Sequence, residues 1–329
     1  MSFSMREFMS SVSLSEPQGS ENLLIFPLFK GEQVDQEVPY LLLEEALEEG
    51  KLKVSEVSTE GTVNTISVEN QADQPILILD GEELLGAKQN RIINATILVP
   101  PKSKINIPVS CVEQGRWRYN TSAFNSSEYF AYSSLRRQKA EQVTDNLEMN
   151  RDFEADQGAI WHEIHRKQAR MKTESPTGAM NDIYRNYEKD IERIVSGIEH
   201  MPGQVGLAVF INGRFTCMDL FDSPVILKKL WSKLLSSYAM EALEYMNEER
   251  KIQKPDIDKV IKAVSDSECK EYPSVGMGTD IRLRGERIIG AGLLSENRLF
   301  HLSVFPKRRS SNSNYRSRMS RPRNRREHM

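Results

Sequence analysis

Hydrophobic and polar positions along the chain follow two different periods. Residues 22–119 contain short apolar runs rich in Val, Ile and Thr, bounded by Gly, Pro, Asn and Asp, which is typical of strands joined by turns. From residue 124 to residue 200 such runs are rare, and apolar residues recur three or four positions apart, which predicts two or three helices. Residues 204–306 return to strand-like runs and include one helical pattern. The predicted order is therefore β, then α, then β with one more helix.

Turn residues support the C-terminal part of this pattern. Asn212-Gly213 lies between two strand-like runs and favours a hairpin, because both central turn positions need a positive φ. An apolar stripe from about Val225 to Arg250 predicts a long helix. The segments TDIRLRG, RIIGAGLL and RLFHLSVF then read as a meander of strands joined by short polar turns.

Two further helices have recognisable ends. Residues 40–52 keep helical spacing, and Gly50 suits a C-terminal stop. Ser175 and Pro176 match the cap and the first position of another helix, which is therefore expected to begin there. Because helices and strands do not alternate along the chain, a doubly wound parallel sheet is not expected.

These patterns predict an α+β fold. We expect an antiparallel, β-rich body, either a sandwich or a partial barrel, with a central helical segment and a C-terminal β-meander. Residues 22–306 are expected to form a single domain. A disordered, Ser-rich N-terminus (residues 1–21) is expected to precede it, and a disordered basic tail (residues 307–329) to follow it.

Charge is unevenly spread along the 329 residues. The net charge is −3, yet the segment from Pro306 to Met329 carries nine Lys or Arg and one Glu, so the body is acidic and the tail is basic. The three cysteines show no CxxC spacing, which argues against a disulfide framework and favours a reducing cytoplasm. The N-terminus lacks the apolar core of a secretion signal, and no apolar run is long enough to span a bilayer, so no membrane association is expected.

A string of polar side chains interrupts the strand-like sequence between residues 78 and 101, ILDGEELLGAKQNRIINATILVPP. If its second half is one extended strand, alternation divides the side chains between two faces, with Lys88, Asn90 and Asn94 on one and Gln89 and Arg91 on the other. These two sets can share a pocket only if the region of Gly86 bends the strand.

The next segment, KINIPVSCVEQGRW, supplies further candidates. If it pairs antiparallel with the polar string, Glu113 comes close to the Asn, Lys and Arg side chains. Carboxylates beside such groups can hold a phosphate or a sugar, or transfer protons. The candidate catalytic residues are Glu82 and Glu113, and the candidate ligand-binding residues are Asp80, Lys88, Gln89, Asn90, Arg91, Asn94 and Arg116. The alternative is purely structural: DGEE is a solvated hairpin tip and KQNR is a polar edge strand.

Several of these segments together resemble a known family. LILDGEELLGAKQNRIINATILVPPKSKINIPVSCVEQGRW, SPTGAMNDIY, VFINGRF and MDLF are similar to the ARG- and rhodanese–phosphatase-superfamily-associated protein domain, over most of residues 22–306. By the association in its name, the resemblance implies chemistry related to ADP-ribose, nucleotides or phosphate. The basic tail lies outside the resemblance.

No metal or cofactor is assigned from the sequence. His162 and His165 are three residues apart, whereas the zinc motif HExxH needs a spacing of four, and no third ligand is evident. Cys111 has no histidine near it in the sequence, which favours a buried structural thiol over a nucleophile.

The sequence leaves two main hypotheses for function. One is a ligand-binding or enzyme-like domain for a phosphorylated, nucleotide or ADP-ribose-type small molecule. The other is a non-catalytic interaction module whose tail, residues 307–329, binds nucleic acid or an acidic partner. A third option, a carbohydrate-binding sandwich, would use exposed rings such as Trp117 and Tyr119.

Overall fold

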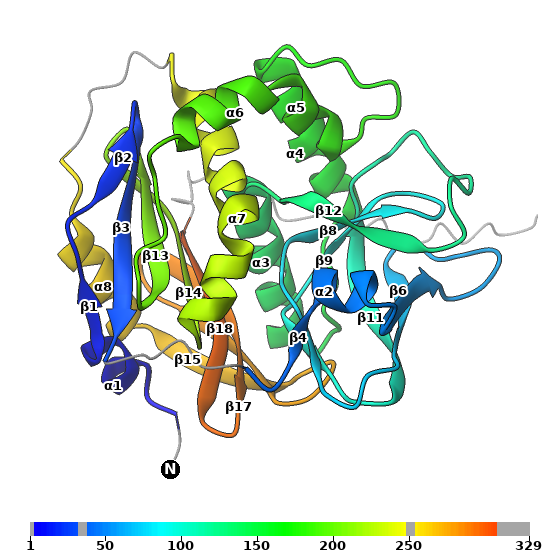
Figure 1. Ribbon diagram of the computed structural model, residues 1–329, viewed down its shortest axis with the longest axis horizontal. Helices are drawn as coiled ribbons and strands as arrows, with labels where there is room; N and C mark the ends of the chain where they lie inside the picture. The colour runs from blue at the N-terminus through cyan, green and yellow to red at the C-terminus, as the bar shows by residue number, and fades with distance from the viewer. Residues whose placement is uncertain (1–2, 32–37, 248–253, 308–329) are drawn as a thin grey trace, which may run out of the picture.

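A large antiparallel sheet forms one side of the molecule (Figure 1). The computed structural model describes residues 3–31, 38–247 and 254–307. The sheet has nine strands in the order β1-β3-β13-β14-β18-β17-β16-β15, and β2 also pairs with β3. They are β1 (Val12–Leu14), β2 (Gln18–Ser20), β3 (Leu23–Lys30), β13 (Gln204–Ile211), β14 (Arg214–Phe221), β15 (Glu268–Pro273), β16 (Thr279–Arg284), β17 (Ile288–Ser295) and β18 (Arg298–Pro306).

Two smaller sheets form the other side. One has six strands in the order β12-β8-β9-β11-β6-β5, and the other has three in the order β10-β7-β4. Their bounds are β4 (Leu41–Leu42), β5 (Leu52–Glu56), β6 (Thr65–Asn70), β7 (Ile76–Ile78), β8 (Glu82–Gly86), β9 (Arg91–Ile93), β10 (Ile97–Val99), β11 (Ser103–Cys111) and β12 (Phe124–Phe130). The pair β4–β7 is parallel, whereas β10–β7 and the strands of the six-stranded sheet pair antiparallel.

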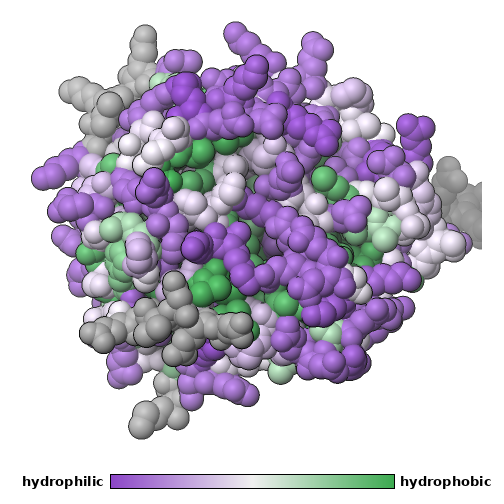
Figure 2. All heavy atoms as spheres, viewed as in Figure 1, coloured by the Kyte–Doolittle hydropathy of each residue, from purple (hydrophilic) through white to green (hydrophobic). Residues whose placement is uncertain are grey.

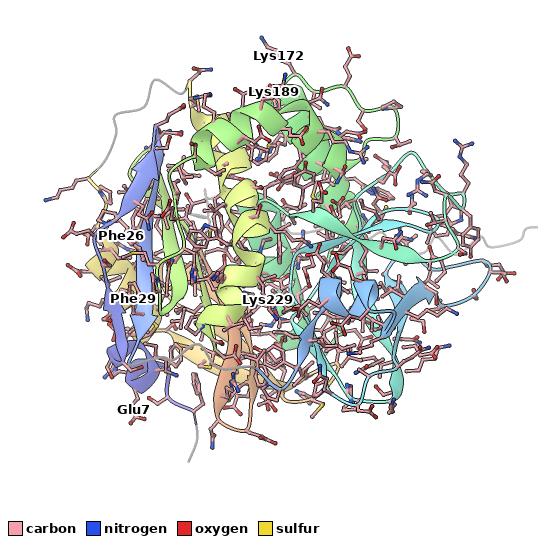
Figure 3. All side chains as sticks on the ribbon, viewed as in Figure 1. Glu7, Phe26, Phe29, Lys172, Lys189 and Lys229 are labelled. Atoms are coloured by element: carbon pink, nitrogen blue, oxygen red, sulfur yellow. The ribbon has the colours of Figure 1, made fainter. Side chains whose placement is uncertain are left out.

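Helices lie between and around the sheets. In Figure 1, α7 (Pro224–Tyr245) and α3 (Ser133–Glu148) lie between the large sheet and the smaller strands. The other helices are α1 (Met5–Ser10), α2 (Leu43–Glu48), α4 (Gln157–Arg170), α5 (Met180–Asn186), α6 (Glu188–Val195) and α8 (Ile257–Ser265). Lys229 of α7, labelled in Figure 3, pairs with Glu45 of α2 at 2.5 Å and so joins the helix to the smaller sheets. No helix within the described residues is both long and apolar enough to cross a membrane.

One hydrophobic core draws on both β-rich parts of the chain. It contains Leu77 and Ile92 from the smaller sheets, Leu207 and Val209 from the large sheet, and Tyr238 from α7. A second core lies on the opposite face of the large sheet, under α1 and α8, and a third lies within the smaller sheets. On the face shown in Figure 2 the surface is mostly hydrophilic, with apolar atoms in small separate areas.

The predicted α+β class is confirmed. Most strands pair antiparallel, and part of the β structure forms a curled half-barrel. The C-terminal meander is present as β16, β17 and β18. At the predicted hairpin between β13 and β14, Asn212 has a φ of 51° and Gly213 a φ of 72°, as this turn requires. The short helix that was expected before Gly50 is α2.

Four details differ from the sequence predictions. Residues 5–20, expected to be disordered, form α1, β1 and β2, because Met5 and Met9 are buried in the core under α8. Residues 124–130, expected to be helical, form β12, whose terminal Phe side chains are buried. The central segment then contains four helices rather than two or three. The last β-rich segment contains α8 in addition to α7.

The helix expected at Ser175 and Pro176 begins later. Gly178 has a φ of +65°, which an α-helix does not allow, so the chain turns there and α5 starts at Met180. Ser175 still acts as a local cap, because its hydroxyl accepts a hydrogen bond from the backbone N–H of Ala179 at 2.8 Å. Of the basic tail, residues 308–329 lie outside the described residues, so the predicted disorder stays a prediction.

Candidate functional site

The polar string does not form one continuous strand. β8 ends at Gly86, which has a φ of +112°, and Ala87 follows with a φ of 41°. A Cβ atom on Gly86 would lie 2.3 Å from the hydroxyl of Thr121, so only glycine fits this bend. The bend turns residues 88–90 out of the strand direction. The second half of the string is also not one strand, because it is divided between β9 (Arg91–Ile93) and β10 (Ile97–Val99). Although the chain bends at Gly86, Gln89 and Arg91 do not join Asn90 in the cleft lining.

Antiparallel pairing brings Glu113 to this bend. β9 pairs with β11, with Arg91 opposite Cys111 and Ile93 opposite Val109, as the sequence predicted. The chain leaves β11 after Cys111, so Glu113 lies beside the residues that precede β9. Its Oε2 accepts a hydrogen bond from the backbone N–H of Asn90 at 3.1 Å, and its backbone carbonyl accepts one from Gln89 Nε2 at 2.9 Å.

A segment far along the chain forms the opposite wall. The backbone N–H of Gly115 donates to the carbonyl of Thr177 at 2.7 Å, and that of Met180 donates to the carbonyl of Val112 at 2.9 Å. A Cβ atom on Gly115 would lie 3.0 Å from the Thr177 backbone, so glycine permits this close approach. Residues 175–182 and the start of α5 are thereby fixed against the segment after β11.

A cleft of about 440 Å³ lies between these two walls. Its charged lining consists of three arginines and two acids, Arg116, Arg118, Arg185, Glu113 and Asp182. Its neutral polar lining consists of Asn90, Tyr119, Asn120, Thr177 and Asn181. The cleft therefore combines cations, amides and hydroxyls, which is the chemical inventory expected for holding a phosphate or a sugar.

One part of the cleft is a rigid hydrogen-bonded frame. Arg116 Nη2 lies 2.6 Å from Glu113 Oε2 and 3.0 Å from Asn90 Oδ1, and its Nη1 donates to the carbonyl of Ala87 at 2.7 Å. Glu113 Oε1 accepts a hydrogen bond from the Thr177 hydroxyl at 2.9 Å. Because these groups satisfy one another, they fix the shape of the cleft and have little capacity left to bind a ligand.

The other two arginines are available. The guanidinium groups of Arg118 and Arg185 form no hydrogen bond and no ion pair with any other residue that the structure describes. Both side chains are exposed. They come from the segment after β11 and from α5, so a bound anion would meet a cation from each side of the cleft.

A buried carboxyl group lies behind Asn181. Glu83 Oε2 accepts hydrogen bonds from the Ser127 hydroxyl at 2.8 Å and from Asn181 Nδ2 at 3.2 Å. The remaining oxygens, Glu83 Oε1 and Asn181 Oδ1, are buried without a hydrogen-bond partner. Burial raises the pKa of Glu83 to about 7. This side of the cleft is therefore backed by a carboxyl group that can be protonated near neutral pH.

The structure separates the other predicted residues from the cleft. Lys88 is not among the lining residues, and its Nζ donates to the carbonyl of Glu60 at 2.6 Å. Gln89 and Arg91 are buried behind Glu113 and bond to each other at 3.1 Å. Asn94 is buried elsewhere and donates to the carbonyl of Phe153 at 3.0 Å. Of the nine predicted residues, the cleft lining contains Asn90, Glu113 and Arg116.

The two acids at the start of the string face away from this site. Glu82 Oε2 accepts a hydrogen bond from the backbone N–H of Leu79 at 2.7 Å, and burial raises the pKa of Glu82 to about 7. Asp80 is buried in an ion pair with Lys139 of α3, whose Nζ also donates to the carbonyl of Ile93 at 2.6 Å. Burial lowers the pKa of Lys139 well below its usual range.

A buried charge network near Asp80 was missing from the sequence prediction. Arg136 of α3 forms two hydrogen bonds with Asp219 of β14, at 2.6 and 3.0 Å. Asp219 also accepts from the Tyr238 hydroxyl at 2.6 Å and lies 3.3 Å from His301 Nε2. His301 Nδ1 lies 2.8 Å from the Thr96 hydroxyl. Although burial opposes ionisation, Arg136 and His301 hold the pKa of Asp219 well below its usual range.

The sequence prediction also missed part of the cleft. Thr177, Asn181, Asp182 and Arg185 follow β11 by more than sixty positions, so nothing local connects them to Glu113. The signal was present in SPTGAMNDIY, which carries polar residues at the point where an apolar helical stripe begins. Among the described residues, no three His, Cys, Asp or Glu side chains converge in a way that could hold a metal ion.

The fold and the cleft define an α+β protein with a polar cleft, built where the end of a sheet meets the start of a helix. The chain belongs to the family of the ARG and Rhodanese-Phosphatase-superfamily-associated Protein domain, whose model matches residues 11–305. This match confirms the resemblance seen in the sequence. Comparison with curated proteins and comparison with solved structures gave no match.

Proposed function

We propose that the cleft binds a small phosphorylated molecule that carries hydroxyl groups, of the sugar phosphate, nucleotide or ADP-ribose type. The observation that carries this proposal is the pair Arg118 and Arg185. Their guanidinium groups line the cleft from two segments and form no hydrogen bond or ion pair with the described residues. Guanidinium groups bind phosphate oxygens in a bidentate geometry, which gives both affinity and orientation.

The rest of the cleft suits the hydroxyl groups of such a ligand. Asn120 and Asn181 line it, and the buried Oδ1 of Asn181 has no hydrogen-bond donor. Side-chain amides both donate and accept hydrogen bonds, so the two residues suit the hydroxyl groups of a sugar. The volume of about 440 Å³ lies within the usual range of small-molecule sites.

For acid–base chemistry we propose Glu113, which acts when a ligand hydroxyl replaces the Thr177 hydroxyl, the one hydrogen-bond donor to its Oε1 among the described residues. Glu113 lines the cleft, and Arg116 lies 2.6 Å from its Oε2, which holds the carboxylate in place. Glu82, the second acid predicted from the sequence, is buried against Leu79 and is outside the cleft lining. We therefore assign Glu82 no contact with the ligand.

The proposal is tested by thermal shift with ADP-ribose, ADP and ribose 5-phosphate, using ribose as the uncharged control. A ligand that binds the folded state raises the melting temperature, and we expect the phosphorylated compounds to do so and ribose not to. The double variant Arg118→Gln/Arg185→Gln should lose the shift. Arg151→Gln, an exposed arginine outside the cleft, should keep it. If no phosphorylated compound shifts the wild-type protein, the proposal is wrong.

Deletion of residues 307–329 separates this proposal from a binding function of the basic tail. Binding in the cleft should survive the deletion, because the lining residues that the structure describes lie between Leu85 and Arg185. Binding that disappears with the tail and weakens steeply with salt would instead support an interaction module for nucleic acid or an acidic partner.

We also propose that the protein works in the reducing cytoplasm. This proposal is supported by its three cysteines, which are all free thiols, two of them buried. Mass spectrometry of alkylated protein from cells should find all three cysteines reduced. A disulfide-linked peptide in that experiment would contradict the assignment.

A further inference from the structure

Two exposed aromatic rings lie in the segment after β11, and one of them, Tyr119, lines the cleft. Trp117 is 46% exposed and Tyr119 is 47% exposed. The other large apolar side chains with comparable exposure in the described ranges, Leu14, Met149 and Met277, are not aromatic and lie outside this loop. Tyr119 lines the cleft, and so does Arg118, which lies between the two rings in the sequence. Folding alone does not explain why both rings remain in contact with solvent beside a polar cleft.

The two rings are restrained by neighbouring cations, and each ring remains about half exposed. The ammonium group of Lys88 lies 5.2 Å from the centroid of each ring, and the guanidinium carbon of Arg91 lies 5.7 Å from the centroid of Trp117. The hydroxyl of Tyr119 donates to the carbonyl of Thr59 at 3.3 Å. These contacts restrain the rings before any ligand binds, which lowers the entropic cost of a stacking contact.

We propose that Trp117 and Tyr119 form a stacking platform for a planar aromatic ring of the cleft ligand, and that the ligand is therefore a nucleotide rather than a simple sugar phosphate. This inference rests on the proposed function of the cleft. A nucleotide has the required layout, because its base is separated from its phosphate by one sugar. With the phosphate on Arg118 and Arg185, the sugar lies over the amides of the cleft and the base reaches the rim. Rings with an open face accept any base, so the platform does not select among bases.

AMP and ribose 5-phosphate form the decisive pair of probes, because they share the sugar and the phosphate and differ by the base. We measure both by isothermal titration calorimetry with the full-length protein. AMP should bind roughly 10- to 100-fold more tightly than ribose 5-phosphate, the range expected for stacking on aromatic side chains. Trp117→Ala and Tyr119→Ala should each reduce that preference, and the double variant should abolish it. The affinity for ribose 5-phosphate should stay unchanged in Trp117→Ala, because Trp117 is not among the lining residues of the cleft.

Met149→Ala is the matched control, since it removes a large exposed apolar side chain far along the sequence from the cleft lining. It should leave both affinities unchanged. As a second readout, acrylamide quenching of the tryptophan fluorescence should fall when AMP binds to the wild-type protein. It should not change with ribose 5-phosphate, nor when AMP is added to Trp117→Ala. Circular dichroism confirms that the exposed-residue variants are folded.

Different results would contradict the stacking platform and the phosphate site. Equal affinities for AMP and ribose 5-phosphate in the wild-type protein would overturn the stacking platform and leave the phosphate site standing. A preference for AMP that survives in the double variant Trp117→Ala/Tyr119→Ala would also overturn it. Failure of both ligands to bind the wild-type protein would overturn the proposed function together with the platform.

Discussion

Glu83 shows how burial changes the chemistry of a single carboxyl group. Its pKa is raised from 4.5 to about 7, mainly by burial. Between these two pH values the folded protein holds a proton that the unfolded chain has already released. The free energy of unfolding therefore falls as the pH rises from 4.5 to 7, and it levels off above pH 7. The total decrease due to this group is about 3 kcal/mol. We predict that Glu83→Gln gains stability relative to wild type between pH 5 and pH 8, as measured by urea denaturation.

Glu128→Gln is the control for this prediction, because Glu128 is an exposed glutamate near the same sheet. Its stability difference from wild type should be the same at pH 5 and pH 8. Some pH dependence should remain in Glu83→Gln, since burial raises the pKa of Glu82 to about 7 as well. If the free energies of unfolding of wild type and Glu83→Gln changed with pH in parallel, the prediction would be wrong, because Glu83 would then be ionised in the folded state.

At the residue scale, the sequence identified side chains but not the direction in which each one points. Asn90, Glu113 and Arg116 were predicted from their chemistry, and they share the cleft. Asp80 and Glu82 belong to the same string, yet they face the interior, because β8 begins immediately after a turn at Gly81 with a φ of +91°. Alternation along an ideal strand cannot predict the side-chain directions around such a turn.

At the element scale, Gly115 controls how closely the two walls of the cleft approach. Gly115→Ala would place a methyl group 3.0 Å from the backbone of Thr177, which cannot move aside as a side chain can. We predict a loss of about 1–3 kcal/mol in the free energy of unfolding, because overpacking forces the backbone to shift. Ligand binding in the cleft should weaken in parallel. Chemical denaturation and calorimetry measure the two effects.

The same substitution at Gly158 provides the comparison. Gly158 lies in the first turn of α4, and an added Cβ there would meet one side-chain oxygen at 3.3 Å. Gly158→Ala should be neutral or slightly stabilising, since alanine is the better helix former. A Gly115→Ala protein with wild-type stability and affinity would mean that the segment at Thr177 adjusts freely.

Elements with strong local signals were predictable, and those formed by distant contacts were not. The Asn212-Gly213 hairpin and α7 carry their turn and cap residues in the sequence, and both are present. β12 was missed because its short, polar sequence is extended through pairing with β8. α1 was missed because its helix depends on packing under α8, which follows more than 240 residues later. The local sequence pattern of a segment does not show which distant segment it will pack against.

At the scale of the whole molecule, the buried charge network around Asp219 joins the large sheet to α3 and to the smaller strands. Arg136 connects α3 to Asp219 in the large sheet, and His301 connects that sheet to Thr96 in the smaller strands. Arg136→Met would leave Asp219 charged and buried without its strongest partner. We predict a loss of about 3–5 kcal/mol in the free energy of unfolding, measured by urea denaturation. Arg6→Met, which removes an exposed ion pair with Asp266, should cost far less in the same assay, because water and salt screen exposed charges.

Because the two β-rich parts share one core, we predict that they unfold together. The main core contains side chains from the large sheet, from the smaller sheets and from α7, so neither part can lose its contacts without exposing apolar surface of the other. Differential scanning calorimetry of a chain truncated after residue 307 should show one transition, with equal calorimetric and van't Hoff enthalpies. Thr96→Val, which removes the hydroxyl beside His301, should lower the temperature of that transition without splitting it. Two separate transitions in the wild-type chain would contradict the single domain and would mean that the shared core contributes little to cooperativity.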